Sequence, residues 1–235
     1  MAPRVGHLKR LINVFGYLKS RPNGKLICDP SYPEHIGHKA NTACNWTDFY
    51  PDATEELPPD MPQPYGPKVR ITCYVDADHA HCRVTRRSTT GILLFVNNMP
   101  VCWVSRQQKT VETSTYGSEL VAARIATNMI IEMQYALRML GMQVEDTSLL
   151  LGDNLSVVLN TTIPSSILKK KHNAIAYHRV REAVAAKIIH FGHVDSSDNL
   201  ADLLTKSLDK ATFYALLKKC LFRVPEIVER KTTKA

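Results

Sequence analysis

Four acidic residues stand at the borders of apolar stretches. Asp76 ends the run VRITCYVD, Glu119 lies within STYGSELVAA, Asp153 follows SLLLG, and Asp202 lies within NLADLLTK. An isolated carboxylate that is buried in such surroundings costs free energy unless something balances its charge. Each of these acids therefore needs a cation, a set of hydrogen bonds or access to solvent.

The chemistry of such a group depends on whether the four acids meet. In an open α/β sheet, the ends of strands and the starts of helices converge on one edge. Carboxylates that share a small volume repel one another and have raised pKa values unless cations bind between them. Mg²⁺ prefers oxygen ligands, and two such ions about 3.5–4 Å apart can activate water and stabilise the leaving oxygen of a phosphodiester. We therefore predict a site for two Mg²⁺ ions, which Mn²⁺ could also occupy.

Each acid, taken singly, also has an ordinary explanation. Glu119 and Asp202 could complement the dipole at the start of a helix, and Asp153 could cap a short helix. Asp76 and its neighbour Asp78 could mark the place where a strand gives way to a turn. These alternatives stay open for the single residues, whereas the joint pattern favours the metal site.

The surrounding periodicity predicts an α/β domain with a mixed sheet and helices packed on it. Alternating or continuous apolar runs predict the strands, and apolar residues three and four positions apart predict the helices. The predicted strands are 25–28, 68–77, 90–97, 100–106, 148–152 and 187–194, and the predicted helices are 7–19, 115–140, 154–160, 172–187 and 198–222. Residues 29–67 hold eight of the thirteen prolines, and this composition predicts an extended connector.

Composition points to an intracellular protein with a polyanionic partner. The net charge is +8 and the sequence pI is about 9.2, which favours nucleic acid as the partner. Six scattered cysteines, no signal peptide and no apolar run of membrane length lead us to expect an intracellular protein without a membrane partner. Phosphate contacts are expected from basic groups and ribose hydroxyl contacts from polar ones. The candidates are Arg87, Ser88, Thr89, Arg106, Gln107, Lys169, Lys170, Lys171 and His172.

Six segments together resemble the ribonuclease H region of copia-type retrotransposon polyproteins. They are YVDADHA, RRSTTGILLF, VCWVSRQQKTVETSTYGSELVAA, LLLGDNLSVVLN, KKKHNAIAYHRVRE and NLADLLTKSL, in this order over residues 68–222. The resemblance implies a ribonuclease H-like fold, with a five-stranded mixed sheet flanked by helices, that cleaves the RNA strand of RNA–DNA hybrids. It places the metal-binding acids on Asp76, Glu119, Asp153 and Asp202. His193 is the nearest match to a catalytic loop histidine, with a spacing to Asp202 one residue shorter than the bacterial pattern.

The resemblance also sets the expected organisation and surroundings of the chain. Residues 1–28 are similar to the end of the reverse transcriptase, so we expect 1–28 as its remnant, 29–67 as connector, 68–223 as the ribonuclease H-like domain and 224–235 as a basic tail. The implied partners are an RNA–DNA hybrid and the reverse transcriptase domain. The implied location is a cytoplasmic virus-like particle or the nucleus. His79, where the family usually has Trp, and Tyr116–Gly117 depart from the family pattern, and Tyr116 and Gly117 are expected to alter the start of the helix at 115.

Two other functions compete with this one. A hybrid-binding or RNA-binding remnant without catalysis would keep the same charge pattern and fold. An integrase-type polynucleotidyl transferase shares the fold but uses acids in the order D, D, E, whereas the order here is D, E, D, D. The order of the acids therefore disfavours the integrase.

Overall fold

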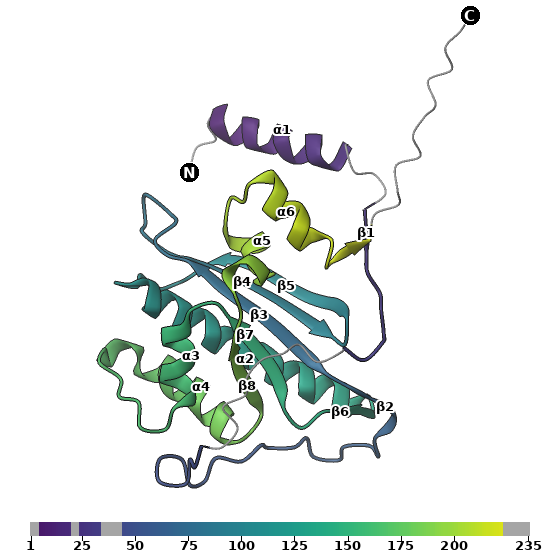
Figure 1. The fold of residues 1–235 in the computed structure, drawn as a ribbon, viewed down its shortest axis with the longest axis vertical. Helices are drawn as coiled ribbons and strands as arrows, with labels where there is room; N and C mark the ends of the chain where they lie inside the picture. The colour runs from purple at the N-terminus through teal and green to yellow at the C-terminus, as the bar shows by residue number, and fades with distance from the viewer. Residues whose placement is uncertain (1–4, 20–23, 34–43, 223–235) are drawn as a thin grey trace, which may run out of the picture.

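A five-stranded mixed sheet forms the centre of the molecule (Figure 1). The computed structural model describes residues 5–19, 24–33 and 44–222. The strand order is β5-β4-β3-β7-β8, in which β3, β4 and β5 are antiparallel and β3, β7 and β8 are parallel. Their bounds are β3 Ile71–Asp78, β4 Thr89–Val96, β5 Met99–Gln107, β7 Ser148–Gly152 and β8 Ile189–His193. The predicted fold class is confirmed.

Helices cover both faces of this sheet, so its central strands β3, β4 and β7 are buried on two sides. α2 (Thr115–Met139) and α4 (Ala174–Ala185) pack on the face that receives Ile71, Cys73 and Val75. α5 (Asp202–Thr205) and α6 (Lys210–Leu217) lie on the other face (Figure 1), where Leu93 and Phe95 meet Leu216. The alternation of side chains along β3 and β4 therefore supplies both cores.

The predicted helix over 198–222 is wrong. That stretch is divided into the 3₁₀ helix η2 (Ser196–Asp198), α5, α6 and a short strand, β9 (Leu221–Phe222). Asp209 begins α6 as its N-cap, since its side chain accepts hydrogen bonds from the backbone N–H groups of Ala211 and Thr212 at 2.9 and 3.1 Å. A capping side chain starts a new helix here instead of continuing the previous one.

Smaller differences occur where short segments pair with distant ones. The predicted strand over 68–77 is two strands that break at Arg70, and the first, β2 (Tyr65–Val69), pairs in parallel with an unpredicted strand, β6 (Met142–Val144). The predicted strand over 25–28 is only β1 (Lys25–Leu26), which pairs with β9. The predicted helix over 172–187 begins with the 3₁₀ helix η1 (Lys171–Asn173), and α3 spans Leu155–Thr162. Pairing over such distances leaves no local pattern in the sequence.

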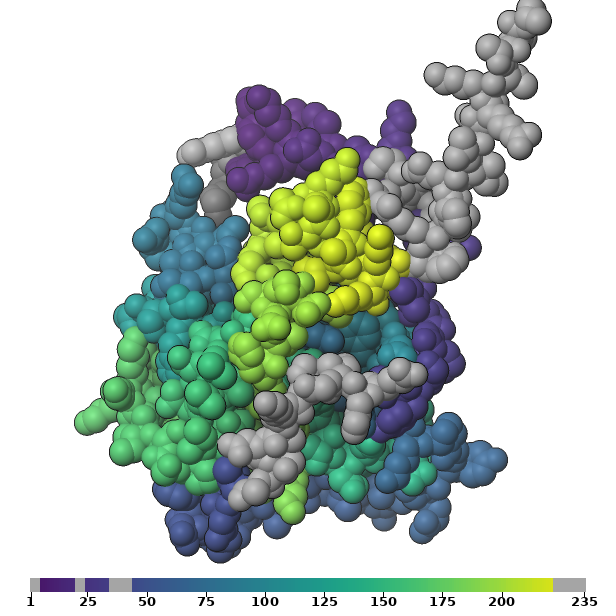
Figure 2. Space-filling model, viewed as in Figure 1, coloured from purple at the N-terminus to yellow at the C-terminus, as the bar shows by residue number. Residues whose placement is uncertain are grey.

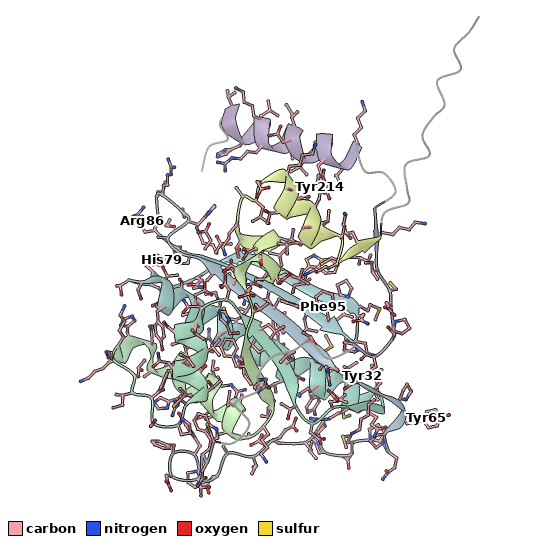
Figure 3. All side chains as sticks on the ribbon, in the orientation of Figure 1. Tyr32, Tyr65, His79, Arg86, Phe95 and Tyr214 are labelled. Carbon is pink, nitrogen blue, oxygen red and sulfur yellow. The ribbon has the colours of Figure 1, made fainter. Side chains whose placement is uncertain are left out.

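The N-terminal helix and the connector lie at opposite ends of the molecule. α1 (Val5–Lys19) lies over α6, where the rings of Tyr17 and Phe213 stand 6.2 Å apart, edge to face (Figure 1). The connector from 44 to 64 runs along the far end (Figure 2). Phe95 lies on the sheet, beneath α6, and Tyr214 lies on α6 itself (Figure 3). The predicted basic tail over 224–235 lies outside the described residues.

Candidate metal centre

Two neighbouring parallel strands bring the first two acids together. Val75 of β3 pairs with Gly152 of β7, so Asp76 and Asp153 come one residue later on adjacent strands at the same edge of the sheet. Glu119 reaches the same edge from α2, where its carboxylate is held by a hydrogen bond from the backbone of Ala77. One carboxylate oxygen from each of these three acids lies within 4.8 Å of the other two.

The fourth acid, Asp202, joins this group from α5. α5 can approach the sheet because β4 has a glycine, Gly91, directly opposite Asp76. A Cβ atom at Gly91 would stand 2.6 Å from Thr205 Cγ2 and 2.8 Å from the carbonyl oxygen of Ala201. Glycine is therefore required where β4 passes under α5.

Lys206 connects the acids of this site. Its ammonium lies 2.8 Å from Asp202 Oδ1, 3.1 Å from Asp76 Oδ1 and 3.7 Å from Asp153 Oδ2. The other oxygen of Asp76, Oδ2, accepts a hydrogen bond from the hydroxyl of Thr205. Asp76 Oδ1 is buried and makes no hydrogen bond of ordinary geometry within the described chain, so the ammonium is its partner through charge.

Burial raises the pKa values of the acids. Burial, with the nearby charges of Asp76 and Asp153, raises the pKa of Glu119 to about 9. Burial likewise raises the pKa of Asp202 to about 6, although its hydrogen bond with Lys206 opposes the rise. The pKa of Asp76 is raised by burial against the opposing effects of Thr205 and Lys206. The site thus holds more acid groups than its internal positive charge can keep ionised.

Lys206 responds in the opposite direction. Burial by itself would lower the pKa of this ammonium. Its hydrogen bond with Asp202 and the charges of Asp76, Asp202 and Asp153 outweigh burial and raise the pKa. Lys206 therefore stays charged beside the acids.

The ordinary explanations fail for two of the acids. The N-cap of α3 is Asn154, whose side chain accepts from the N–H of Val157 at 3.2 Å, so Asp153 does not cap it. α2 has no acid in its first turn, so Glu119 does not complement its dipole. Asp202 does stand in the first turn of α5, a helix of only four residues.

The sequence around α2 begins the helix in an ordinary way despite its departures from the family. Ser114 is the N-cap and accepts from the N–H of Gly117 at 3.3 Å. Gly117 allows Glu112 to approach, since a Cβ there would stand 2.7 Å from Glu112 Oε2. The Nδ1 atom of His79 lies 3.4 Å from the hydroxyl oxygen of Ser118. Tyr116, Gly117 and His79 therefore leave the position of Glu119 intact.

His193 and Ser196 surround Asp153. His193 ends β8, is exposed, and has Nε2 3.1 Å from the backbone oxygen of Asp153. Ser196 donates from its hydroxyl to Asp153 Oδ2 at 2.9 Å. The predicted histidine is thus beside the acids, whereas Asp78 forms a separate pair with His81 Nδ1 at 2.5 Å.

The predicted nucleic-acid contacts divide into exposed and engaged side chains. Those with exposed positions are Arg87, Arg106, Gln107, Lys169, Lys171 and His172, and Thr89 is half-buried. The loop from 79 to 88 continues β3 beyond Asp78 and carries His79 and Arg86 (Figure 3). Exposed basic groups therefore flank the edge of the sheet on which the acids meet.

Four of the predicted contacts have partners inside the protein, among them Gln107, whose side-chain amide donates to Thr85 Oγ1 at 3.5 Å. Ser88 is fully buried, and its hydroxyl accepts from the N–H of Ala80 at 3.1 Å. Lys170 donates to Ser114 Oγ at 2.7 Å, and His172 Nε2 lies 3.4 Å from Glu112 Oε2. These last two contacts attach the basic segment to the start of α2.

Sequence reasoning missed Thr205, Lys206 and Ser196. Lys206 stands four residues after Asp202 on the same short helical segment, a spacing that brings side chains together, so that signal was available. Nothing local distinguishes Thr205 or Ser196, because their partners are 129 and 43 residues away in the sequence.

Comparison with known proteins shows which family the chain resembles. No protein-family model matches the chain. The retrovirus-related Pol polyprotein from transposon RE1 of Arabidopsis thaliana is 31% identical over 164 residues, which is 68% of this chain and 11% of that polyprotein. The corresponding polyprotein from transposon TNT 1-94 of Nicotiana tabacum is 29% identical over 140 residues, or 60% of this chain and 10% of its own length.

A relative that is 31% identical over 68% of the chain shows the family. This chain belongs to the ribonuclease H region of copia-type retrotransposon Pol polyproteins. The resemblance noted from the sequence is confirmed, and the chain spans about a tenth of the length of the curated Pol polyproteins that it matches.

Solved ribonuclease H structures are also similar to this Pol segment. The N-terminal RNase H domain of Rv2228c from Mycobacterium tuberculosis has a TM-score of 0.46 and 11% identity, over 64% of this chain and 97% of that one. RNase H1 from Halobacterium salinarum has a TM-score of 0.45 and 17% identity, over 58% and 94%. Among the described residues of the Pol segment, no helix combines the length and apolar character needed to cross a bilayer.

Proposed function

We propose that this Pol segment is a metal-dependent ribonuclease H that hydrolyses the RNA strand of RNA–DNA hybrids during reverse transcription. The observation that carries the proposal is the meeting of Asp76, Glu119 and Asp153 within 4.8 Å, at the edge of a sheet with this strand order. Asp202 stands beside them, joined through Lys206. Buried carboxylates this close to one another repel unless cations bind between them.

The donor set fits Mg²⁺, with Mn²⁺ as a possible substitute. All the groups are carboxylate oxygens, which hard divalent cations prefer. Asp76 Oδ1 is buried without a hydrogen bond of ordinary geometry among the described residues and has only the positive charge of Lys206 beside it, so it is an oxygen that a divalent cation could bind. When bound, two such ions would supply Lewis-acid stabilisation of the phosphodiester and activation of the attacking water. Asp76, Glu119, Asp153 and Asp202 would hold them.

His193 is proposed to move a proton beside the reacting phosphate. If Nε2–H donates to the backbone oxygen of Asp153, the other ring nitrogen, Nδ1, can accept a proton. The ring is exposed, so it can exchange that proton with solvent. This assigns His193 to proton transfer and not to metal binding.

Exposed basic side chains are proposed to bind the hybrid. Arg87, Arg106, Lys169 and Lys171 would contact phosphates, and such binding weakens as salt is added. Gln107 and Thr89 could reach ribose hydroxyls, which distinguish RNA from DNA. The engaged residues Lys170 and His172 would position this basic segment. The proposed protein partner is the reverse transcriptase domain of the same polyprotein, inside a cytoplasmic particle or the nucleus.

One observation favours a second function, a hybrid-binding remnant without catalysis. The ammonium of Lys206 already contacts three of the four acids, so part of their charge is balanced without a metal ion. A protein that has lost metal binding could remain folded with this arrangement. It would bind the hybrid equally well with and without Mg²⁺ and would cut nothing.

Cleavage of a labelled RNA–DNA hybrid tests both functions. We expect Mg²⁺-dependent cutting of the RNA strand that EDTA abolishes, with RNA duplex and DNA duplex left intact. Asp153→Asn should lower the rate by about a hundredfold or more, because several kcal/mol of charge stabilisation would be lost.

The matched control is Asp146→Asn. Asp146 is exposed and stands just before β7, at the opposite end of the strand from Asp153. The Asp146→Asn protein should cut the hybrid at the rate of the unmodified protein. Full activity in Asp153→Asn would refute the metal assignment, and a folded protein that binds but never cuts would favour the remnant.

A further inference from the structure

Lys206 is placed where a divalent cation would need to bind. Its ammonium lies 3.1 Å from Asp76 Oδ1 and 3.7 Å from Asp153 Oδ2, and both residues belong to the three acids that meet within 4.8 Å. It also lies 2.8 Å from Asp202 Oδ1. A lysine ammonium is a compact point charge, so it can stand among carboxylates as a metal ion does.

An ordinary helix pair does not account for this arrangement. In an ordinary ion pair at this spacing on a helix surface, Asp202 and Lys206 would contact only each other. Here the ammonium also contacts two further acids, Asp76 on β3, which is 1% exposed, and Asp153 directly after β7. The lysine therefore pairs with three of the four acids and not with Asp202 alone.

The side chain also has room to leave. The Lys206 side chain is 36% exposed, whereas those of Asp76, Asp153 and Asp202 are 1%, 11% and 8% exposed. The acids are thus held by the protein, while the lysine stem is flexible and borders solvent. An ammonium and a divalent cation repel each other strongly at this range, so both cannot occupy the centre of the cluster.

We infer that Lys206 is the internal counter-ion of the acid cluster. Its ammonium holds the acids together before a metal ion binds, and it must withdraw from the cluster when a divalent cation enters. The inference rests on the proposed function in one respect, the binding of a cation by these acids. It adds that this chain sets its own metal affinity through a competing side chain.

The test is calorimetric titration of the protein with Mg²⁺ alone, without nucleic acid. Lys206→Met removes the ammonium and keeps a similar unbranched stem. It should bind Mg²⁺ about tenfold more tightly, because no internal cation has to be displaced. With EDTA present, its melting temperature should fall, because the acids lose their counter-ion.

Two matched variants complete the design. Lys206→Arg keeps the charge and should keep both the Mg²⁺ affinity and the melting temperature near those of the unmodified protein. Lys219→Met removes a lysine whose ammonium lies 2.8 Å from Asp198 Oδ1, apart from the cluster. It should leave the Mg²⁺ affinity unchanged.

The outcomes separate this inference from the proposed function. If the unmodified protein binds no Mg²⁺, the proposed function fails. If it binds Mg²⁺ and Lys206→Met binds with equal or lower affinity, the lysine only supports the structure and the inference is overturned. Should Lys206→Met not fold, NMR of lysine side chains in the unmodified protein decides, since Mg²⁺ should shift the Lys206 signal and leave that of Lys219 in place.

Discussion

At the scale of single residues, Glu119 links metal binding to pH. Its pKa is raised from the ordinary 4.5 to about 9, first by burial and then by the charges of Asp76 and Asp153. The folded protein therefore holds a proton on Glu119 that the unfolded chain releases above about pH 4.5. The free energy of unfolding of the metal-free protein should fall as pH rises from about 4.5 toward about 9, by at most about 1.4 kcal/mol per pH unit for this one group.

A cation reverses the preference, because it binds the ionised carboxylate and releases the proton. The rise in melting temperature caused by Mg²⁺ should thus be larger at about pH 8 than at about pH 6. Thermal unfolding with EDTA and with excess Mg²⁺ measures both effects. Glu119→Gln carries no titrating group there, so an unchanged pH slope in this variant would show that another residue is responsible.

At the scale of elements, the contact between β4 and α5 decides where Asp202, Thr205 and Lys206 stand. Gly91→Ala would place a methyl group 2.6 Å from Thr205 Cγ2 and 2.8 Å from the backbone oxygen of Ala201. The backbone of α5 would have to move away from the sheet. We expect a loss of about 1–3 kcal/mol in the free energy of unfolding and weaker Mg²⁺ binding.

Denaturant unfolding and calorimetry measure these two losses. Gly16→Ala is the control, because nothing lies within 4 Å of a Cβ atom at Gly16 in α1. It should leave both quantities unchanged or slightly raise stability, since alanine favours a helix. A Gly91→Ala protein with normal stability and normal Mg²⁺ affinity would contradict the role given to this contact.

At the scale of the whole molecule, Arg181 attaches the connector to the domain. Its guanidinium is buried, donates to the backbone oxygens of Ile163 and Pro164 at 2.8 and 2.6 Å, and lies over the rings of Trp46 and Tyr177 at 4.7 and 4.8 Å. The region around Trp46 therefore packs on the ribonuclease H-like part instead of passing it freely.

Arg181→Met should lower the free energy of unfolding by about 2–4 kcal/mol, because it leaves buried backbone oxygens without donors. It should also speed limited proteolysis in residues 44–64. Arg179→Met, two residues earlier on α4, removes one hydrogen bond to Asn128 and should cost less than about 1.5 kcal/mol. Equal losses in the two variants, measured by denaturant unfolding, would show that Arg181 has no special role in holding the connector.

The sequence by itself determined the central strands and the placement of two of the acids, Asp76 and Asp153, at or near the ends of these strands. Apolar alternation along β3 and β4, and the continuous apolar run of β7, are local patterns, so they suffice to place Asp76 close to the end of β3 and Asp153 directly after β7. Topology then requires that adjacent parallel strands end at the same edge.

Only the tertiary structure decided what surrounds those acids. Lys206 and Thr205 reach Asp76 because Gly91 lets α5 approach the sheet, a contact between segments more than a hundred residues apart. The surroundings of Ser88 also depend on tertiary packing. The turn after β3 folds back, and the backbone N–H of Ala80 donates to the hydroxyl of Ser88. Local periodicity encodes elements, whereas the counter-ions and hydrogen bonds of a site depend on how the elements pack.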